Sequence, residues 1–494
     1  MKRTLPVTQQ PFATMLKIYL LTVLSVLCCS ANAQVTVTSV LGPQELAVVP
    51  FDYAMDGTEI TLAEMDSGLF VSPYSIRAFY EEASYGKMTI RGIVYPYRTN
   101  QPPLFGTGYT SCYPEDAVIA NQPDVDYSII DGIVIFPHDT ASGKSCSAGL
   151  SSSEKLPFST PVGNHEFRRS GFRTQFYFPN DFSQTTSSTI AHELMHSFGN
   201  DFHSNAYIKI DGEWTLQGYG NLFDILGLRS QASHPCSMIK HKLGWLTENE
   251  IKTVQQTDTF RIYALEKTLP GKTQALIVEL PHAVDLQPND AFAFDRLYLE
   301  YRGLTGFDYR SPALRRVRLK DNSYHANDNI HGLLVIGVDC TSGDDCLPML
   351  IDMRPEPIGG LGAGYLPHEA SDAPLLLGEK YTVPGNEISM EVINVNEGNY
   401  IDVVITMPAV ASSIEPYRLD GVEIYPSPAQ DYIRISNPNA KSLTARLYDV
   451  YGNLVLNGEN GTTMDISGLS AGVYILIVRD INTNRSMSRH IVKL

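Results

Sequence analysis

The sequence predicts an α+β domain at the N-terminal end of the chain, followed by two domains built from β-strands. The chain has 494 residues, which is too many for one ordinary domain. Up to about residue 257, strand-like runs such as DGIVIFP alternate with helical patterns such as YSIRAFYEEASYG. From about residue 260, short β-branched and aromatic runs are separated by turn-forming residues, which is an all-β pattern.

The composition limits the class of protein. Apolar residues make up 43% of the chain and charged residues 18%, so the chain can bury hydrophobic cores and is not disordered as a whole. Asp and Glu number 54 against 37 Lys and Arg, which gives a net charge of −17. This balance argues against a nucleic-acid partner, because phosphate contacts need a basic surface.

Residues 1–33 have the pattern of a secretory signal peptide. Lys2, Arg3 and Lys17 make the start positive, and an apolar run over residues 18–29 follows. Small residues end at Ala33, so we expect cleavage after it. The apolar run is too short to span a bilayer, and we expect no membrane span in the mature chain.

The mature chain divides by pattern into four segments. We expect residues 34–257 to form the α+β domain and residues 258–408 a β-rich domain. Residues 409–419 resemble a linker in composition. The short strands of residues 420–494 recur about every ten residues, which predicts a small β-sandwich.

Five cysteines remain in an exported chain, where an oxidising compartment permits disulfides. Cys340 and Cys346 flank the turn-like sequence TSGDD and are the first pair that we expect. Cys112 with Cys146 is the second, which leaves Cys236 over. Connectivity cannot be deduced from sequence, and an odd number leaves at least one thiol unpaired or intermolecular.

The chemistry of the chain is concentrated in the string TIAHELMHSFGNDFHSNAY. His192 and His196 are four residues apart, so a helix places both imidazoles on one face, where they can share one ion. Glu193 lies between them. This HExxH arrangement predicts a Zn²⁺ site in which Glu193 serves as general base for an activated water.

A third zinc ligand must come from elsewhere in the chain. In the longer motif HExxHxxGxxH a glycine turns the chain sharply, so that a third histidine reaches the metal. Gly199 is in place here, but Phe202 occupies the ligand position and cannot ligate. His203 is one residue later and is our preferred ligand, because imidazole suits zinc well. Asp201, one residue earlier, is the alternative; if neither reaches, a distant Glu is needed.

These motifs resemble those of zinc metallopeptidases of the gametolysin and immune-inhibitor-A type, within the metzincin-like zincins. The resemblance is carried by FYEEASYGKMTIRGIVYP, VDYSIIDGIVIFP, HELMHSFGNDFHSNAY, YGNLFDILG, HKLGWL and LYLEYRG, and it covers most of residues 35–407. It implies that the N-terminal domain is a zincin catalytic domain, with a twisted sheet, an active-site helix and a Met-turn under the zinc.

The turn segment departs from the family at one position. Asp224 and Gly227 match the family's turn, but Leu226 stands where the family has methionine. Leucine is apolar and of similar volume, so we expect it to form the floor of the site with a modest loss at most. Tyr219 opens this segment and has two interpretations: a helper at the oxyanion, or a packed aromatic ring.

The resemblance implies a secreted zinc metalloendopeptidase that cleaves proteins or peptides. The alternative is a surface adhesin or binding protein on a degenerate zincin scaffold, which the shifted third ligand and Leu226 favour. Ca²⁺ is a second ion to consider, because acidic pairs such as Asp344–Asp345 occur in secreted proteins, although EF-hand spacing is absent and a solvated loop is the stronger interpretation.

The C-terminal segment resembles a type IX secretion sorting domain. The resemblance is carried by GVEIYPSPAQDYIRIS, ARLYDVYGNLVLN, MDISGLSAGVYILIVRD and the ending RHIVKL, over about residues 420–494. It implies a Gram-negative bacterium and the type IX secretion machinery as a partner. We therefore expect a secreted or outer-surface protein, once the signal peptide has been removed.

Overall fold

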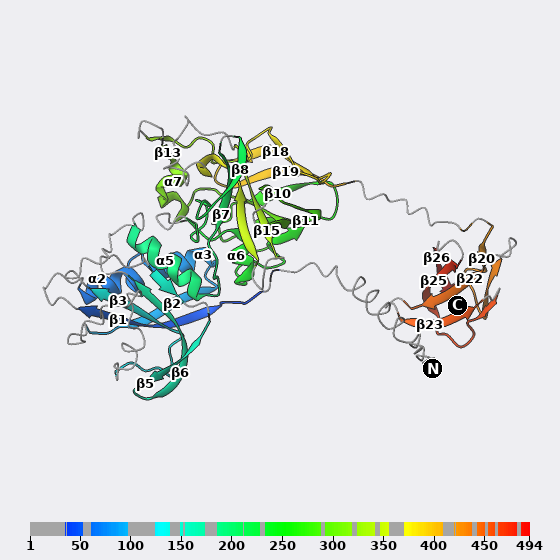
Figure 1. The fold of residues 1–494 in the computed structure, drawn as a ribbon, viewed down its shortest axis with the longest axis horizontal. Coiled ribbons are helices and arrows are strands. Elements are labelled where there is room, and N and C mark those ends of the chain that lie inside the picture. The colour runs from blue at the N-terminus through cyan, green and yellow to red at the C-terminus, as the bar shows by residue number, and fades with distance from the viewer. Residues whose placement is uncertain are drawn as a thin grey trace, which may run out of the picture. The chain divides into compact units, whose positions relative to one another are not determined.

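The structure is a computed structural model. It describes Val35 and residues 37–52, 61–96, 124–138, 149–151, 154–172, 185–210, 212–227, 233–287, 292–318, 324–340, 346–354, 370–408, 419, 421–436, 442–449, 453–459, 463–481 and 486–494. The chain divides into two compact units, residues 1–408 and 409–494, drawn in blue to yellow and in orange to red in Figure 1. The predicted signal peptide lies outside the described residues.

The first unit begins with a six-stranded sheet in the order β2-β1-β3-β6-β4, with β5 also paired to β6. Its strands are β1 (Gly42–Asp52), β2 (Met88–Val94), β3 (Gly132–His138), β4 (Gly149–Ser151), β5 (Leu156–Thr160) and β6 (Gly163–Phe172). The pairs β1–β2, β1–β3 and β3–β6 are parallel, whereas β4 and β5 run antiparallel to β6.

The helices of this unit are short except for one. They are α2 (Leu62–Asp66), the π-helix η1 (Ser67–Val71), α3 (Ile76–Ala83), α5 (Thr185–Ser197), α6 (Ser237–Lys242), the 3₁₀ helix η2 (Asp308–Arg310) and α7 (Pro312–Arg315). The side chain of Ser75 caps α3 by accepting a hydrogen bond from the amide of Ala78. Helices thus occur within both segments that the sequence predicts to be helical, and α5 carries the HExxH residues.

The two faces of this sheet are covered differently. Successive residues of β1 point to opposite faces. Leu46 and Val48 join a core that also contains buried residues of α3 and α5, such as Phe79 and Leu194. Ala47 and Val49 join a separate cluster with the aromatic rings of Tyr127, Phe158 and Phe167. The sheet therefore holds α5 against one of its faces.

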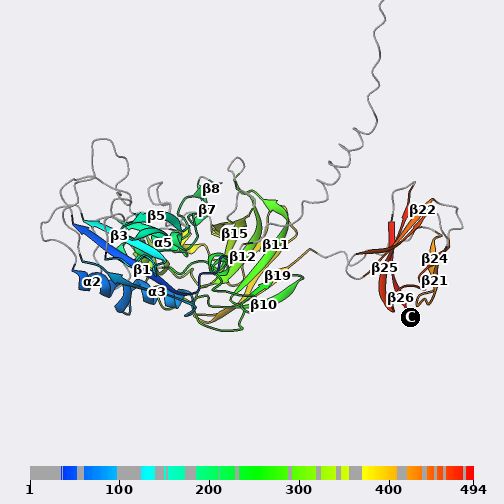
Figure 2. The same ribbon diagram turned by 90° about the horizontal axis from the view of Figure 1, so that it is seen from below.

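Two further sheets complete the first unit (Figure 2). A seven-stranded sheet has the order β8-β7-β16-β15-β12-β11-β9 and a four-stranded sheet the order β10-β19-β18-β17. Their strands are β7 (Asn205–Ile210), β8 (Glu213–Gln217), β9 (Ile251–Thr253), β10 (Asp258–Tyr263), β11 (Ala275–Val284), β12 (Phe294–Tyr301), β15 (Leu333–Asp339), β16 (Leu347–Ile351), β17 (Lys380–Thr382), β18 (Ser389–Asn396) and β19 (Tyr400–Thr406). The strands β13 (Arg316–Arg318) and β14 (Tyr324–Ala326) form a small antiparallel pair, which lies between β12 and β15 in the sequence.

The expected boundary near residue 257 is not where the structure divides. Strands β7 and β8 come from before this boundary, yet β7 pairs with β16 from well after it, in parallel. The core around α5 also contains Tyr298 and Leu334 from the β-rich segment. Residues 34–257 and 258–408 therefore belong to one compact unit, because a sheet and a core run through both.

The second unit is a β-sandwich, as the strand spacing predicts. One sheet contains β20 (Glu423–Tyr425), β21 (Tyr432–Ser436) and β24 (Thr463–Asp465) in the order β20-β21-β24. The other contains β22 (Leu443–Tyr448), β23 (Leu454–Glu459), β25 (Gly472–Asp480) and β26 (Ser486–Lys493) in the order β23-β22-β25-β26. Ile433 of the first sheet and Leu447, Leu476 and Ile491 of the second are buried in one shared core.

Candidate metal centre

Helix α5 presents the HExxH residues from a rigid, buried position. Ile190, Ala191, Leu194 and Met195 are all buried in the core. The hydroxyl of Tyr80 on α3 donates a hydrogen bond to the carbonyl of Ala191 at 2.5 Å. Buried neighbours of the two histidines and this hydrogen bond therefore anchor the helix in the core.

Three imidazoles converge at this helix. His196 Nε2 lies 3.2 Å from His192 Nε2 and 3.2 Å from His203 Nε2. The nitrogens that could bind a metal all lie within 4.8 Å of one another. A tetrahedral Zn²⁺ bound at about 2.0–2.1 Å to each nitrogen separates its ligands by about 3.3 Å, which the two separations from His196 match.

The outer nitrogens of two of these rings are held by backbone carbonyls. His192 Nδ1 lies 2.7 Å from the carbonyl oxygen of Ile225, and His196 Nδ1 lies 2.5 Å from that of Asn200. A carbonyl only accepts, so each Nδ1 carries the proton and each Nε2 keeps its lone pair toward the centre. Burial also lowers the pKa of His196, which favours the neutral imidazole that a metal needs.

The turn after α5 brings in His203 despite the additional residue. Gly199 has φ +93°, a conformation that favours glycine, and Lys242 Nζ donates to its carbonyl at 2.7 Å. Phe202 is buried, with Lys242 Nζ 5.2 Å from its ring centroid. Asp201 is exposed and does not belong to the group of three. Of the two alternatives, the structure thus places His203 beside His192 and His196.

Glu193 shares the helix with its neighbours but is not one of the grouped ligands. Its residue is only 7% exposed. A carboxylate next to three imidazoles that could hold a metal can take a proton from an activated water, which is the role that the sequence predicts for Glu193.

The segment from Asn221 to Gly227 forms a tight turn beneath His192. Asp224 Oδ1 accepts from the amide of Leu226 at 2.9 Å, and the amide of Gly227 donates to the carbonyl of Asp224 at 2.9 Å. A Cβ on Gly227 would lie 1.7 Å from the carbonyl oxygen of Asn221. Leu226 is fully buried. Asp224 and Gly227 therefore set the turn that presents the Ile225 carbonyl to His192.

A buried ionic network supports this turn from behind. Arg302, which follows β12, donates to Glu300 Oε1 at 2.7 Å, to Asp308 Oδ2 at 2.8 Å and to the carbonyl of Phe223 at 2.7 Å. All three charged side chains are fully buried. The sequence reasoning did not assign them a role. The run LYLEYRG is otherwise apolar, but Glu300 and Arg302 stand at alternate positions of it and therefore share one strand face. This pattern was the signal available in the sequence.

The other residues named from sequence divide into three groups. Cys340 and Cys346 form the predicted disulfide. Cys236 is a free, buried thiol whose backbone amide donates to Asp224 Oδ2 at 3.1 Å. Cys112, Cys146 and the acidic pair Asp344–Asp345 lie outside the described residues.

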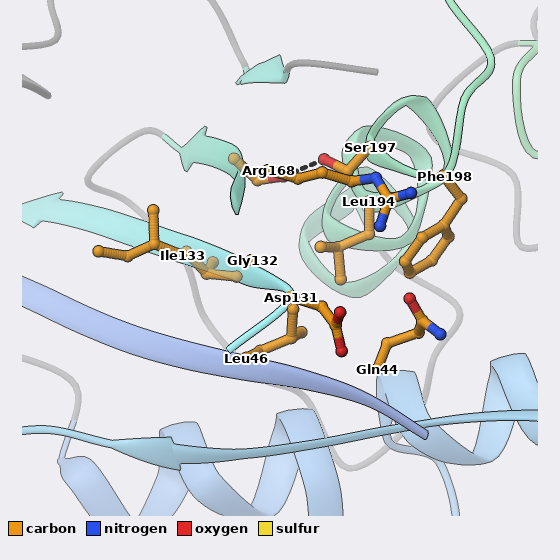
Figure 3. A pocket seen from close by; sticks show the side chains of 11 residues that line it. Gln44, Leu46, Asp131, Gly132, Ile133, Arg168, Leu194, Ser197 and Phe198 are labelled. Atoms are coloured by element: carbon orange, nitrogen blue, oxygen red, sulfur yellow. Dashed lines mark hydrogen bonds between the residues drawn. The ribbon is translucent and has the colours of Figure 1, made fainter. Parts of the chain in front are cut away.

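A small pocket lies at the C-terminal end of α5 and contains none of the three histidines. Figure 3 shows the polar ends of Arg168, Asp131 and Gln44 directed toward one another there. Ser197 of α5 and Ser170 of β6 share a hydrogen bond of 2.6 Å at its edge. This pocket lies between the end of α5 and the first sheet, and it is separate from the candidate metal centre.

The family match lies in the second unit. Residues 423–493 match the family described as the secretion system C-terminal sorting domain. They are a type IX secretion sorting domain. The domain directs the chain to secretion or to the outer cell surface and makes the type IX machinery its partner. No helix in the described parts of the chain is long and apolar enough to cross a membrane.

Relatives share only parts of the chain. An endo-acting ulvan lyase from Formosa agariphila is 37% identical over 76 residues, which is 15% of this chain and 15% of the lyase. PorZ, a surface component of the type IX secretion system of Porphyromonas gingivalis, is 13% identical over 45% of this chain and 39% of its own, with a TM-score of 0.14. The extracellular domain of a protein from B. thetaiotaomicron is 14% identical over 37% and 25%, with a TM-score of 0.12. These two TM-scores are too low to relate the folds.

Proposed function

We propose that this protein is a secreted zinc-dependent endopeptidase. The observation that carries the proposal is the convergence of the Nε2 atoms of His192, His196 and His203, with Glu193 beside them on α5. Three protein ligands leave one position of a tetrahedral zinc open, which is the arrangement of catalytic rather than structural zinc sites. The sorting domain supports the extracellular part of the proposal.

In this proposal His192, His196 and His203 hold the ion through Nε2. A zinc ion bound there would lower the pKa of water toward about 7 and polarise a substrate carbonyl. Glu193 would take the proton of the attacking water and pass it to the leaving amide nitrogen, so that the peptide bond breaks with the proton accounted for. The carbonyls of Ile225 and Asn200 would keep two of the rings oriented throughout.

The same proposal includes a zincin fold for the part of the chain around α5. Its support is the sequence of elements: a sheet, the helix α5, a glycine turn, a third histidine and a tight turn under His192. Because the seven-stranded sheet continues into the β-rich segment, the catalytic unit in this proposal extends to residue 408 rather than ending near residue 257.

The alternative of an adhesin on a degenerate zincin scaffold rests on two departures from the family pattern. The additional residue before His203 still leaves its Nε2 at 3.2 Å from that of His196. The second departure, Leu226, is fully buried within the turn. Both departures are thus accommodated by the local structure, which supports the peptidase over the alternative.

The experiment is peptide-library cleavage by the mature protein beside Glu193→Ala, with zinc content measured in both. We expect cleavage by the parent only and equal zinc, because Glu193 is not a ligand in the group. Glu213→Ala, an exposed glutamate at the start of β8, is the matched control and should cleave as the parent does. Equal cleavage by the parent and Glu193→Ala would refute the assignment. Zinc binding without cleavage by the parent would favour a binding role.

A further inference from the structure

Tyr219 occupies a backbone conformation that normally belongs to glycine. The amide of Gly220 donates to the carbonyl of Gln217 at 3.1 Å, which closes a four-residue turn after β8. Tyr219 is the third residue of this turn and has φ +59°. Type II turns favour glycine at this position, and a bulky residue there is a genuine outlier. Glycines flank it on both sides, so the turn places a large side chain at its least favourable position.

The ring of Tyr219 lies against the metal centre. Its centroid is 3.9 Å from that of His203, with 35° between the planes, and 6.1 Å from that of His192. The residue is 39% exposed. The Tyr219 ring therefore packs on the His203 imidazole and stays partly open to solvent.

The turn is tied to the same stretch of chain that carries His203. The side chain of Asn205 accepts a hydrogen bond through Oδ1 from the amide of Tyr219 at 3.1 Å. Asn205 begins β7, two residues after His203. The amide of Asn221 also donates to the carbonyl of Ser204 at 3.3 Å. Two hydrogen bonds thus join the turn to the residues that directly follow His203.

We infer that Tyr219 is a positioning residue whose ring, rather than its hydroxyl, holds His203 in the orientation that binds metal. His203 lies beyond α5, on a turn lengthened by one residue, so the orientation of its ring needs support in addition to its contact with His196 of α5. Aromatic contact supplies it, and the strained backbone is the cost of placing the ring there. The inference deepens the proposed function and rests on its metal site.

The test uses three variants of the mature protein and measures zinc affinity rather than activity. Tyr219→Phe keeps the ring and removes the hydroxyl. Tyr219→Asn keeps a residue that tolerates the left-handed conformation but removes the ring. Tyr309→Asn, at a tyrosine that is 58% exposed, is the matched control. Zinc dissociation constants are obtained by chelator competition with the metal-free proteins, and Co²⁺ absorption spectra report the ligand set.

We expect Tyr219→Phe and Tyr309→Asn to bind zinc as the parent does. Tyr219→Asn should bind zinc about tenfold more weakly or worse, because the loss of a group that supports a metal ligand has an effect of this size. Its Co²⁺ spectrum should change, while unfolding of the metal-free protein should show that the fold is kept. Equal affinity of Tyr219→Asn and the parent would overturn the inference, as would an equal loss in Tyr219→Phe.

The outcomes separate this inference from the proposed function. If the parent binds zinc, Tyr219→Asn weakens this binding and Tyr219→Phe does not, then the inference holds even when no peptide is cleaved. If the parent cleaves peptides and Tyr219→Asn keeps full zinc affinity, the peptidase stands and the inference falls. If the parent binds no zinc, both fall.

Discussion

Arg302 and Phe223 are joined by a hydrogen bond of 2.7 Å, from the guanidinium of one to the carbonyl of the other, across 79 positions of sequence. Phe223 lies two residues before Ile225, whose carbonyl holds His192. The buried cation Arg302 of the β-rich segment thus contacts the turn beside the candidate metal centre. This contact adds to the sheet and the core that the α5 region shares with the β-rich segment.

Removal of this cation is expected to be costly. Arg302→Met leaves Glu300 and Asp308 buried without their partner, and such losses cost about 3–5 kcal/mol of unfolding free energy. Arg261→Met is the control, because the Arg261–Asp402 pair is partly exposed and its removal should lower the unfolding free energy much less. Urea unfolding measures both. Losses of similar size in the two variants would contradict the structural role of Arg302.

Lys240 should give the protein a characteristic pH dependence. Burial lowers the pKa of Lys240 to about 7 from its ordinary value of 10.5, and Arg302 adds to the shift, while Asp308, Glu266 and Glu300 oppose it. Between these two values the unfolded chain binds more protons than the folded one, so stability rises with pH.

The measurement compares the parent with Lys240→Met by urea unfolding from pH 7 to 9.5. The unfolding free energy of the parent should rise relative to the variant by up to about 1.4 kcal/mol per pH unit. The variant loses the hydrogen bonds of Lys240 Nζ to Tyr85 and Leu265 at every pH, so only the slope carries the result. Parallel curves would mean that Lys240 does not titrate in this window.

The disulfide between Cys340 and Cys346 should contribute modestly to stability. It closes a short loop, since the cysteines are six positions apart, and the loop-entropy estimate is about 2 kcal/mol. The double variant Cys340→Ser/Cys346→Ser should therefore unfold at a lower temperature than the parent. Reductant should lower the unfolding temperature of the parent to that of the variant, and it should leave the unfolding temperature of the variant unchanged. A variant as stable as the oxidised parent would exclude a stabilising bond.

The sorting domain should decide where the chain is found. A chain that lacks residues 423–493 should remain in the periplasm, because the signal that the type IX machinery recognises is gone. Cell fractionation followed by detection of the chain measures this. A Glu193→Ala chain that keeps the domain is the control and should reach the outside. Secretion of the shortened chain would show that export depends on another segment.

The parts of the site that follow local rules were predictable from sequence. Residues four apart on a helix share a face, so His192 and His196 meet wherever that helix forms. The choice between His203 and Asp201 was not predictable, because the backbone angles after Gly199 decide which side chain turns inward. The contact of Arg302 with the turn was not predictable for a different reason, because Phe223 lies 79 positions away in the sequence and only the folded chain brings the two together. The domain boundary near residue 257 failed for the same reason, because β7 and β16 pair across it.

The most direct test of the central claim is zinc removal and stepwise return, with bound zinc and peptide cleavage measured on the same samples. The mature protein is stripped with a chelator and titrated with Zn²⁺. If His192, His196 and His203 form a catalytic zinc site, cleavage should vanish on removal and rise in proportion to bound zinc up to one ion per chain. His203→Ala should bind zinc more weakly in the same titration. Undiminished cleavage by the stripped protein, or cleavage that does not follow the bound metal, would contradict the account.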